Sequence, residues 1–160
     1  MTAGPQERLA ELGLTLPAVT PPLAAYVPAV RTGNYVYVSG QLPMVDGQLL
    51  ATGKVGAQVD VDRAKALARI CALNALAAAA SVAGGLSGIT RIVKVTGFVA
   101  SAPDFTDQAL VINGASELLV EVFGDAGRHA RSAVGMAVLP RDTPVEVELI
   151  AEVAPAAGAA

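Results

Sequence analysis

The chain of 160 residues has no tryptophan, one histidine and one cysteine. The lone cysteine, Cys71, excludes an internal disulfide and a site built from several thiolates, so the sequence fits a reducing cytoplasm better than secretion. Charged residues make up only 16% of the chain, against about 25% in an average soluble protein. The net charge of −3 comes from scattered residues without a basic stripe, and we therefore expect no nucleic-acid partner.

Targeting and membrane-spanning segments are also missing from the pattern. The most apolar stretch, 64–85, contains Lys65, Arg69 and Asn74, and no basic segment followed by a hydrophobic one stands at the N-terminus. We expect neither a membrane span nor a signal peptide. Hydrophobic residues nevertheless make up 53% of the chain. A domain this small buries such an excess most simply at a subunit interface, which predicts a homo-oligomer.

Residue periodicity and turn signals predict one α+β domain. Strands are expected at 27–31, 34–39, 48–50, 89–100, 131–139 and 145–153, and helices at 6–12, 60–82 and 105–123. This order predicts a mixed β-sheet of about six strands with the two longer helices on one face. Other subunits of a closed oligomer would cover the second face. Three prolines in 17–22 suggest that residues 1–25 form an extended arm outside the core, and 154–160 reads as a frayed tail.

Most signatures of catalysis are absent. The sequence has no glycine-rich phosphate loop, no cluster of metal ligands and no nucleophile elbow, so we expect neither a cofactor nor a metal. The only histidine, His129, falls in a short polar turn and is expected to be solvated and without a catalytic role. Cys71 is expected to be a small core residue of a helix.

Charged residues on two predicted strands are candidates for function. Arg131 begins an apolar strand, where an arginine either forms a surface salt bridge or clamps a carboxylate through two parallel hydrogen bonds. Glu146 and Glu148 are two residues apart on a strand, so both project from one face. Val145 and Val147 are expected to be buried under the helices, so the glutamates between them project from the opposite face. That face is the one assigned to subunit contact. A carboxylate buried there needs a polar partner or a functional role.

Short motifs at these positions resemble the RidA/YjgF family over about residues 26–153. The matching residues are Tyr26, Ser39-Gly40-Gln41-Leu42-Pro43, Asn113 after Asp104-Phe105, Arg131-Ser132, Leu139-Pro140 and Val145-Glu146-Val147-Glu148. The resemblance implies a chorismate-mutase-like fold and a homotrimer with clefts between neighbouring subunits. It also implies cofactor-independent hydrolysis of reactive enamines and imines, such as 2-aminoacrylate and 2-iminopropionate, to 2-keto acids and ammonia.

The same resemblance assigns roles to individual residues. Arg131 would bind the substrate carboxylate and Glu148 would orient or activate water. Tyr26, Ser39, Gly40, Asn113 and Ala133 would line the cleft. Family deaminases commonly have a cysteine where this chain has Ala133, whose backbone carbonyl could serve instead. The chain also has an added N-terminal arm that could reshape or cover the cleft.

These departures are typical of a divergent branch and keep a second hypothesis open. The alternative is a non-catalytic trimer that binds small carboxylates such as 2-keto acids at Arg131. Retention of both Arg131 and Glu148 favours catalysis, because binding a carboxylate requires only the arginine. Endoribonuclease activity, ascribed to some relatives, gains no support from an acidic chain without a basic patch.

Overall fold

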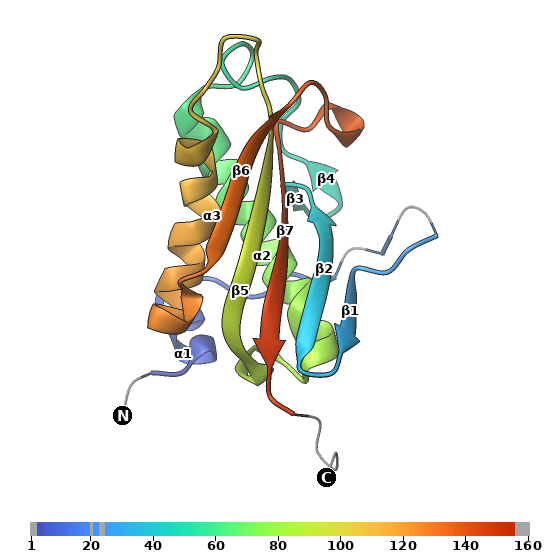
Figure 1. Ribbon diagram of the computed structural model, residues 1–160, viewed down its shortest axis with the longest axis vertical. Coiled ribbons are helices and arrows are strands. Elements are labelled where there is room, and N and C mark those ends of the chain that lie inside the picture. The colour runs from blue at the N-terminus through green and yellow to red at the C-terminus, as the bar shows by residue number, and fades with distance from the viewer. Residues whose placement is uncertain (1–2, 20, 23–24, 156–160) are drawn as a thin grey trace.

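The computed structural model describes residues 3–19, 21–22 and 25–155. Its main feature is a five-stranded sheet in the order β1-β2-β7-β5-β6, with two long helices on one face (Figure 1). The sheet is mixed because β5 and β6 are parallel while the other pairs are antiparallel. Its strands are β1 (Ala29–Thr32), β2 (Tyr35–Gln41), β5 (Ile89–Ala100), β6 (Ala130–Met136) and β7 (Val145–Val153). The helices are α1 (Pro5–Glu11), α2 (Val61–Ala83) and α3 (Gln108–Phe123).

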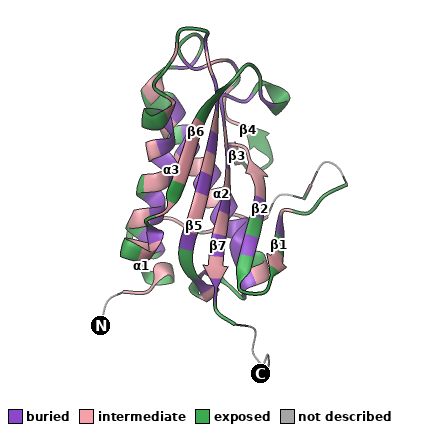
Figure 2. Ribbon diagram, in the orientation of Figure 1, coloured by how far each residue is buried: buried purple, intermediate pink, exposed green. Residues whose placement is uncertain are grey.

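The central strand β7 sorts its side chains between the two faces by strict alternation. Its odd-numbered residues, from Val145 to Val153, are buried beneath the helices, and its even-numbered residues are half-buried on the other face (Figure 2). We call that second face the open face. Large apolar side chains remain exposed on it. They are Val30, Tyr35, Tyr37, Val134 and Met136.

The long helix α2 begins and ends where the sequence predicts. The Asp60 carboxylate accepts a hydrogen bond from the Arg63 backbone N–H at 2.8 Å, and Gly84 closes the helix in the left-handed region at φ 78°. Among the described residues only α2 is long and apolar enough to cross a membrane. It packs against the sheet and α3, and 61% of its most apolar 18-residue stretch is buried, so it serves as a core helix.

Glycine allows α2 and α3 to approach closely. A Cβ at Gly114 would collide with the backbone carbonyl oxygen of Lys65. An ion pair between Lys65 and Glu117, with 2.8 Å between Nζ and Oε1, also joins these helices. The glycine after Asn113 is therefore required by the packing of α3 on α2.

Several predictions from the sequence need correction. The main sheet has five strands, because β4 (Gln48–Leu49) pairs with β3 (Met44–Val45) in a separate hairpin. Helix α3 starts at Gln108 instead of 105, since Phe105 closes a turn with its N–H donating to Ala102. Strand β6 ends at Met136 and does not reach 139.

The N-terminal segment is not wholly an arm outside the core. Helix α1 packs against α3, and its Leu9 is fully buried within the main hydrophobic cluster. No helix or strand forms in the stretch that follows, residues 14–19. Of the predicted tail, 156–160 lies outside the described residues.

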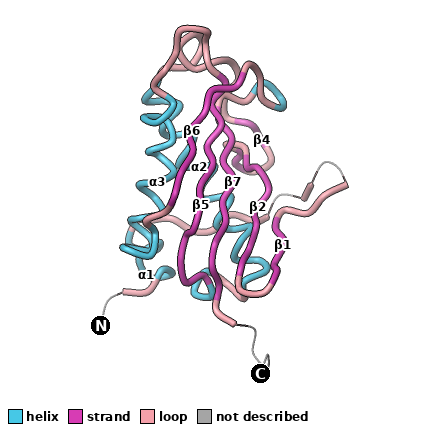
Figure 3. The backbone as a smooth tube through the Cα atoms, in the orientation of Figure 1, coloured by secondary structure: helices cyan, strands magenta, loops and turns pink. Residues whose placement is uncertain are grey.

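The long connections gather at one end of the sheet (Figure 3). Backbone hydrogen bonds join Val55 to Ala100, Ala102 to Val55, and Gly53 to Asp142. Three loops from distant parts of the chain therefore brace each other and hold the strand ends in place.

Candidate functional site

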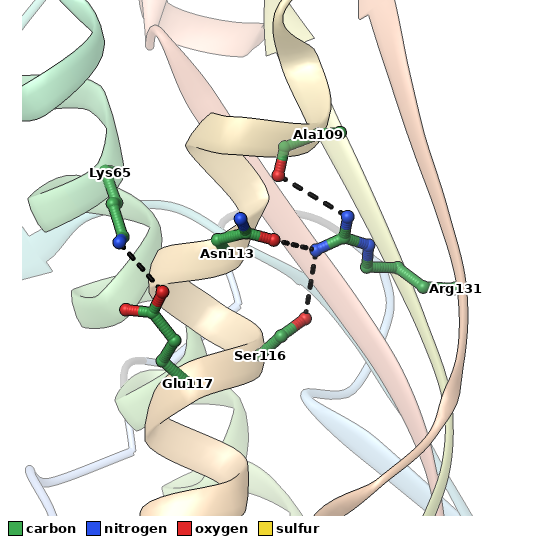
Figure 4. A network of polar contacts seen from close by, with 6 residues as sticks. All are labelled: Lys65, Ala109, Asn113, Ser116, Glu117 and Arg131. Atoms are coloured by element: carbon green, nitrogen blue, oxygen red, sulfur yellow. Dashed lines mark hydrogen bonds and ion pairs between the residues drawn. The ribbon is translucent and has the colours of Figure 1, made fainter.

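Arg131 points from the start of β6 toward α3, where three groups hold its guanidinium (Figure 4). Its Nη1 donates to Asn113 Oδ1 at 2.8 Å and to Ser116 Oγ at 3.2 Å, and Nη2 donates to the Ala109 carbonyl at 3.4 Å. Within the described residues, these bonds leave Nε–H and one N–H of Nη2 without a protein acceptor. Two such donors on one edge of a guanidinium can bind a carboxylate through parallel hydrogen bonds.

The arginine is therefore not in the surface salt bridge that the sequence left open. All of its described partners are neutral, so its charge is uncompensated in the described part of the chain. The predicted pair of Arg131 and Asn113 comes together. Ala133 follows on the same face of β6, partly buried against the core.

The Ser39-Gly40-Gln41 segment forms a second group of predicted residues. A bulge between Val38 and Gln41 interrupts the pairing of β2 with β7. Ser39 Oγ donates to the Val27 carbonyl at 2.7 Å, and Gln41 Nε2 donates to the Ser39 carbonyl at 3.0 Å. These bonds fix the segment locally and leave Gly40 facing β7.

The acidic side chain beside Gly40 is Glu146. A Cβ at Gly40 would overlap the Glu146 carboxylate, so only glycine leaves room for it. Burial raises the pKa of Glu146, and the nearby Glu148 carboxylate raises it further. A carboxyl group with a raised pKa can exchange protons nearer to neutral pH, as a general acid or base must.

Glu148 occupies a different place on the open face. It lines a hollow with Tyr37, Lys94, Thr96 and Ile150. Both glutamates project from the open face as predicted, but only Glu146 lies against Gly40. The family resemblance assigned the water-activating role to Glu148. The bulge in β2 instead places Gly40 beside Glu146.

Tyr26 joins the Gly40 group across a pocket. The pocket is lined by Tyr26, Pro28, Gly40, Gln41, Leu42, Met44 and Asn74, together with Pro21 and Pro22 of the arm. Asn74 of α2 fixes one wall, because its Nδ2 donates to the Leu42 and Met44 carbonyls, both at 3.0 Å. The prolines of the arm thus border this pocket.

The two groups lie on opposite faces of the sheet. Arg131 pairs with Val95, which is buried under the helices, so Arg131 shares the helix-covered face at the sheet edge. Glu146 projects from the open face of β7, and β5 runs between β7 and β6. One protomer therefore does not bring Arg131 and Glu146 to a shared crevice.

Two residues next to Arg131, His129 and Ser116, make contacts that the sequence did not predict. The prediction of a solvated His129 is wrong, because the ring is half-buried with a partner on each nitrogen. Nδ1 lies 2.6 Å from the Gly127 carbonyl, and Nε2 lies 2.9 Å from Ser116 Oγ. Ser116 carried no sequence signal, since helical serines are usually surface residues. Its position depends on the packing of α3 against β6.

The prediction for Cys71 is confirmed. The thiol is fully buried, 3.8 Å from the Val145 carbonyl, and burial raises its pKa, so it stays protonated at neutral pH. Among the described residues, no three His, Cys, Asp or Glu side chains gather to hold a metal ion.

Known proteins resemble this chain in both fold and sequence. Residues 6–153 match a family described as "YjgF/chorismate_mutase-like, putative endoribonuclease". "Protein TCP17" of Trypanosoma cruzi is 45% identical over 145 residues, which is 90% of this chain and 91% of that protein. The crystal structure of Atu1372 of Agrobacterium tumefaciens, a protein of unknown function, is 52% identical with a TM-score of 0.85 and covers 94% of this chain and 93% of its own.

A third relative has a descriptive name. Escherichia coli TdcF, named "Putative reactive intermediate deaminase", is 32% identical over 131 residues, which is 81% of this chain and 87% of that protein. Its crystal structure with bound serine has a TM-score of 0.63 and 30% identity, and covers 88% of this chain and 96% of its own. The family match spans nearly the whole chain, and it includes helix α1 except for its first residue. The chain therefore belongs to the RidA/YjgF family.

Proposed function

We propose that this protein hydrolyses small enamines and imines that carry a carboxylate, giving a 2-keto acid and ammonia. The observation that carries the proposal is the open Nε/Nη2 edge of Arg131, held in place by Asn113, Ser116 and Ala109. The relative TdcF supports it twice, through its name and through its bound serine, which is a small amino carboxylate.

The reaction requires little from the protein beyond the positioning of substrate and water. Arg131 holds the carboxylate, and the water oxygen attacks the imine carbon while Glu146 accepts a water proton. Glu146 passes this proton to the imine nitrogen, which gives a carbinolamine. It then carries the hydroxyl proton of the carbinolamine to the same nitrogen as the carbon–nitrogen bond breaks, which leaves the keto group and ammonia. One 2-iminopropionate and one water thus give one pyruvate and one ammonia, and no cofactor is needed. A positioned substrate and one acid–base group are sufficient for an intermediate that is already unstable.

We assign the acid–base role to Glu146 instead of Glu148. Glu146 has the raised pKa and lies beside Gly40, whose missing side chain makes room for its carboxylate. Tyr26 and Ser39 border the same region, whereas Glu148 belongs to a separate hollow. Ala133 would offer its backbone on the Arg131 side.

Such a site needs two copies of the chain. Because Arg131 and Glu146 lie on opposite faces of the sheet, one small substrate reaches both only where the β6 edge of one protomer meets the open face of the next. The exposed apolar side chains of the open face, including Tyr37 and Met136, support burial of that face between protomers. We propose a homotrimer, in which three copies of one interface form three sites.

The test is hydrolysis of imines produced in place by an amino-acid oxidase. The wild-type protein is expected to accelerate keto-acid formation, and Arg131→Ala to abolish the acceleration while the oligomer stays folded. If the wild-type protein accelerates none of several imines, the deaminase proposal fails. Binding of pyruvate by that inactive protein would then support a carboxylate-binding role instead.

A further inference from the structure

Ser116 and His129 form a connected chain with Arg131. Ser116 Oγ lies 3.2 Å from Arg131 Nη1 and 2.9 Å from His129 Nε2, and His129 Nδ1 lies 2.6 Å from the Gly127 carbonyl. The carbonyl only accepts, so Nδ1 carries a proton and donates it. In the neutral ring Nε2 is then an acceptor, and the Ser116 hydroxyl donates to it.

The direction of these bonds matters for Arg131. Once its proton is committed to His129, the Ser116 oxygen presents its lone pairs to the arginine Nη1–H. Donation to His129 also polarises the hydroxyl and makes its oxygen a stronger acceptor. Together with Asn113 on the same nitrogen, this fixes the rotation of the guanidinium and leaves the Nε/Nη2 edge outward.

We propose that Ser116 and His129 are positioning residues that hold Arg131 in the orientation required to bind the carboxylate of the ligand. This inference rests on the proposed function, since it concerns the same arginine. Neither residue needs to contact the ligand. They act through the guanidinium and are expected to affect ligand affinity more than the chemical step.

The neutral state of His129 fits this role. Burial lowers the pKa of His129, the hydrogen bond to Gly127 opposes that effect, and the Arg131 charge lowers the pKa further. Other charged groups on the surrounding elements are mostly paired: Glu117 with Lys65, Glu121 with Arg69, and Asp125 with Arg128. Lys94 of β5 lies opposite Ala130, but it projects from the open face beside Glu148. The ring therefore remains an acceptor for Ser116 at neutral pH.

Three variants separate positioning from other roles. Ser116→Ala removes the acceptor for Arg131, and His129→Leu fills the space without accepting a hydrogen bond. His129→Gln keeps an amide oxygen that can accept from Ser116 near the position of Nε2. Ser81→Ala is the matched control. Ser81 is likewise a helical serine, but it lies on α2 and its hydroxyl donates to the Ala78 carbonyl.

The assay measures KM and kcat for imine hydrolysis, and pyruvate affinity by calorimetry. Ser116→Ala and His129→Leu are each expected to raise KM and weaken pyruvate binding about tenfold, the usual loss for one hydrogen bond to a charged group, with little change in kcat. His129→Gln and Ser81→Ala should match the wild type. An unchanged KM in Ser116→Ala and His129→Leu, or a His129→Gln variant as impaired as His129→Leu, would overturn the proposal.

A second measurement keeps the inference testable without activity. The chain has one histidine, so the imidazole signals in a nuclear magnetic resonance titration of untagged protein belong to His129. Replacing Arg131 by Gln removes the cation that lowers the pKa of His129 and is expected to raise that pKa. An unchanged pKa would show that the two side chains are not coupled. If the wild-type protein neither binds pyruvate nor hydrolyses imines, the proposed function fails, whatever this titration shows.

Discussion

Gly40→Ala is expected to impair the proposed site while leaving the fold intact. The added Cβ would lie 2.8 Å from Glu146 Cδ and would overlap the carboxylate oxygen, so one of the two must move. The Glu146 carboxylate ends a flexible side chain, and its rotation costs the fold little. The acid–base group would then shift by about 1 Å, a displacement that costs on the order of a hundredfold in rate.

The assay is imine hydrolysis, paired with thermal unfolding. We expect kcat/KM to fall about a hundredfold in Gly40→Ala, with an unfolding temperature close to the wild type. Gly4→Ala is the matched control, because nothing lies within 4 Å of a Cβ at Gly4. Full activity in a folded Gly40→Ala protein would refute the placement of Glu146 at the reacting centre.

Further predictions concern acidity and packing. Glu146→Gln should abolish turnover, whereas Glu148→Gln, a matched change two residues away, should retain most of it. Because the folded pKa of Glu146 is raised, its contribution to stability is complete at low pH and is lost as pH rises through that pKa. Glu146→Gln should therefore unfold at a higher temperature than the wild type at pH 7, and the difference should vanish below about pH 4. Gly114→Ala should destabilise the fold by about 2 kcal/mol in denaturant titrations, because the new Cβ meets the rigid Lys65 carbonyl and the clash outweighs the gain in helix propensity. A Gly114→Ala protein as stable as the wild type would contradict the close packing of α2 and α3.

The fold was largely predictable because its signals are local. Asp60 and Gly84 mark the ends of α2 through capping geometry, and alternation along 145–153 gives the buried face of β7. The hairpin of β3 and β4 was mistaken for part of the main sheet, because a two-residue strand carries no signal of which sheet it joins. The burial of Leu9 depends on contact with α3, more than 90 residues away, which no local pattern records.

The site was predictable in its residues more than in its arrangement. Arg131 with Asn113, and Gly40 with Tyr26, meet as expected from the family resemblance. The choice between Glu146 and Glu148 depends on a bulge in a different strand, and the role of His129 depends on the turn that folds it back to Ser116. Such contacts between distant segments follow from how the helices and strands pack together, and the spacing of residues along the sequence does not reveal them.

Subunit complementation tests the central claim most directly, namely that each site combines Arg131 of one protomer with Glu146 of another. Arg131→Ala and Glu146→Gln proteins, each inactive alone, are unfolded together, refolded as a mixture and assayed for imine hydrolysis. If the sites lie between protomers, random mixing at equal amounts restores about a quarter of the wild-type sites. No recovery of activity from mixed oligomers would contradict the account, because it would place both residues of each site in a single chain.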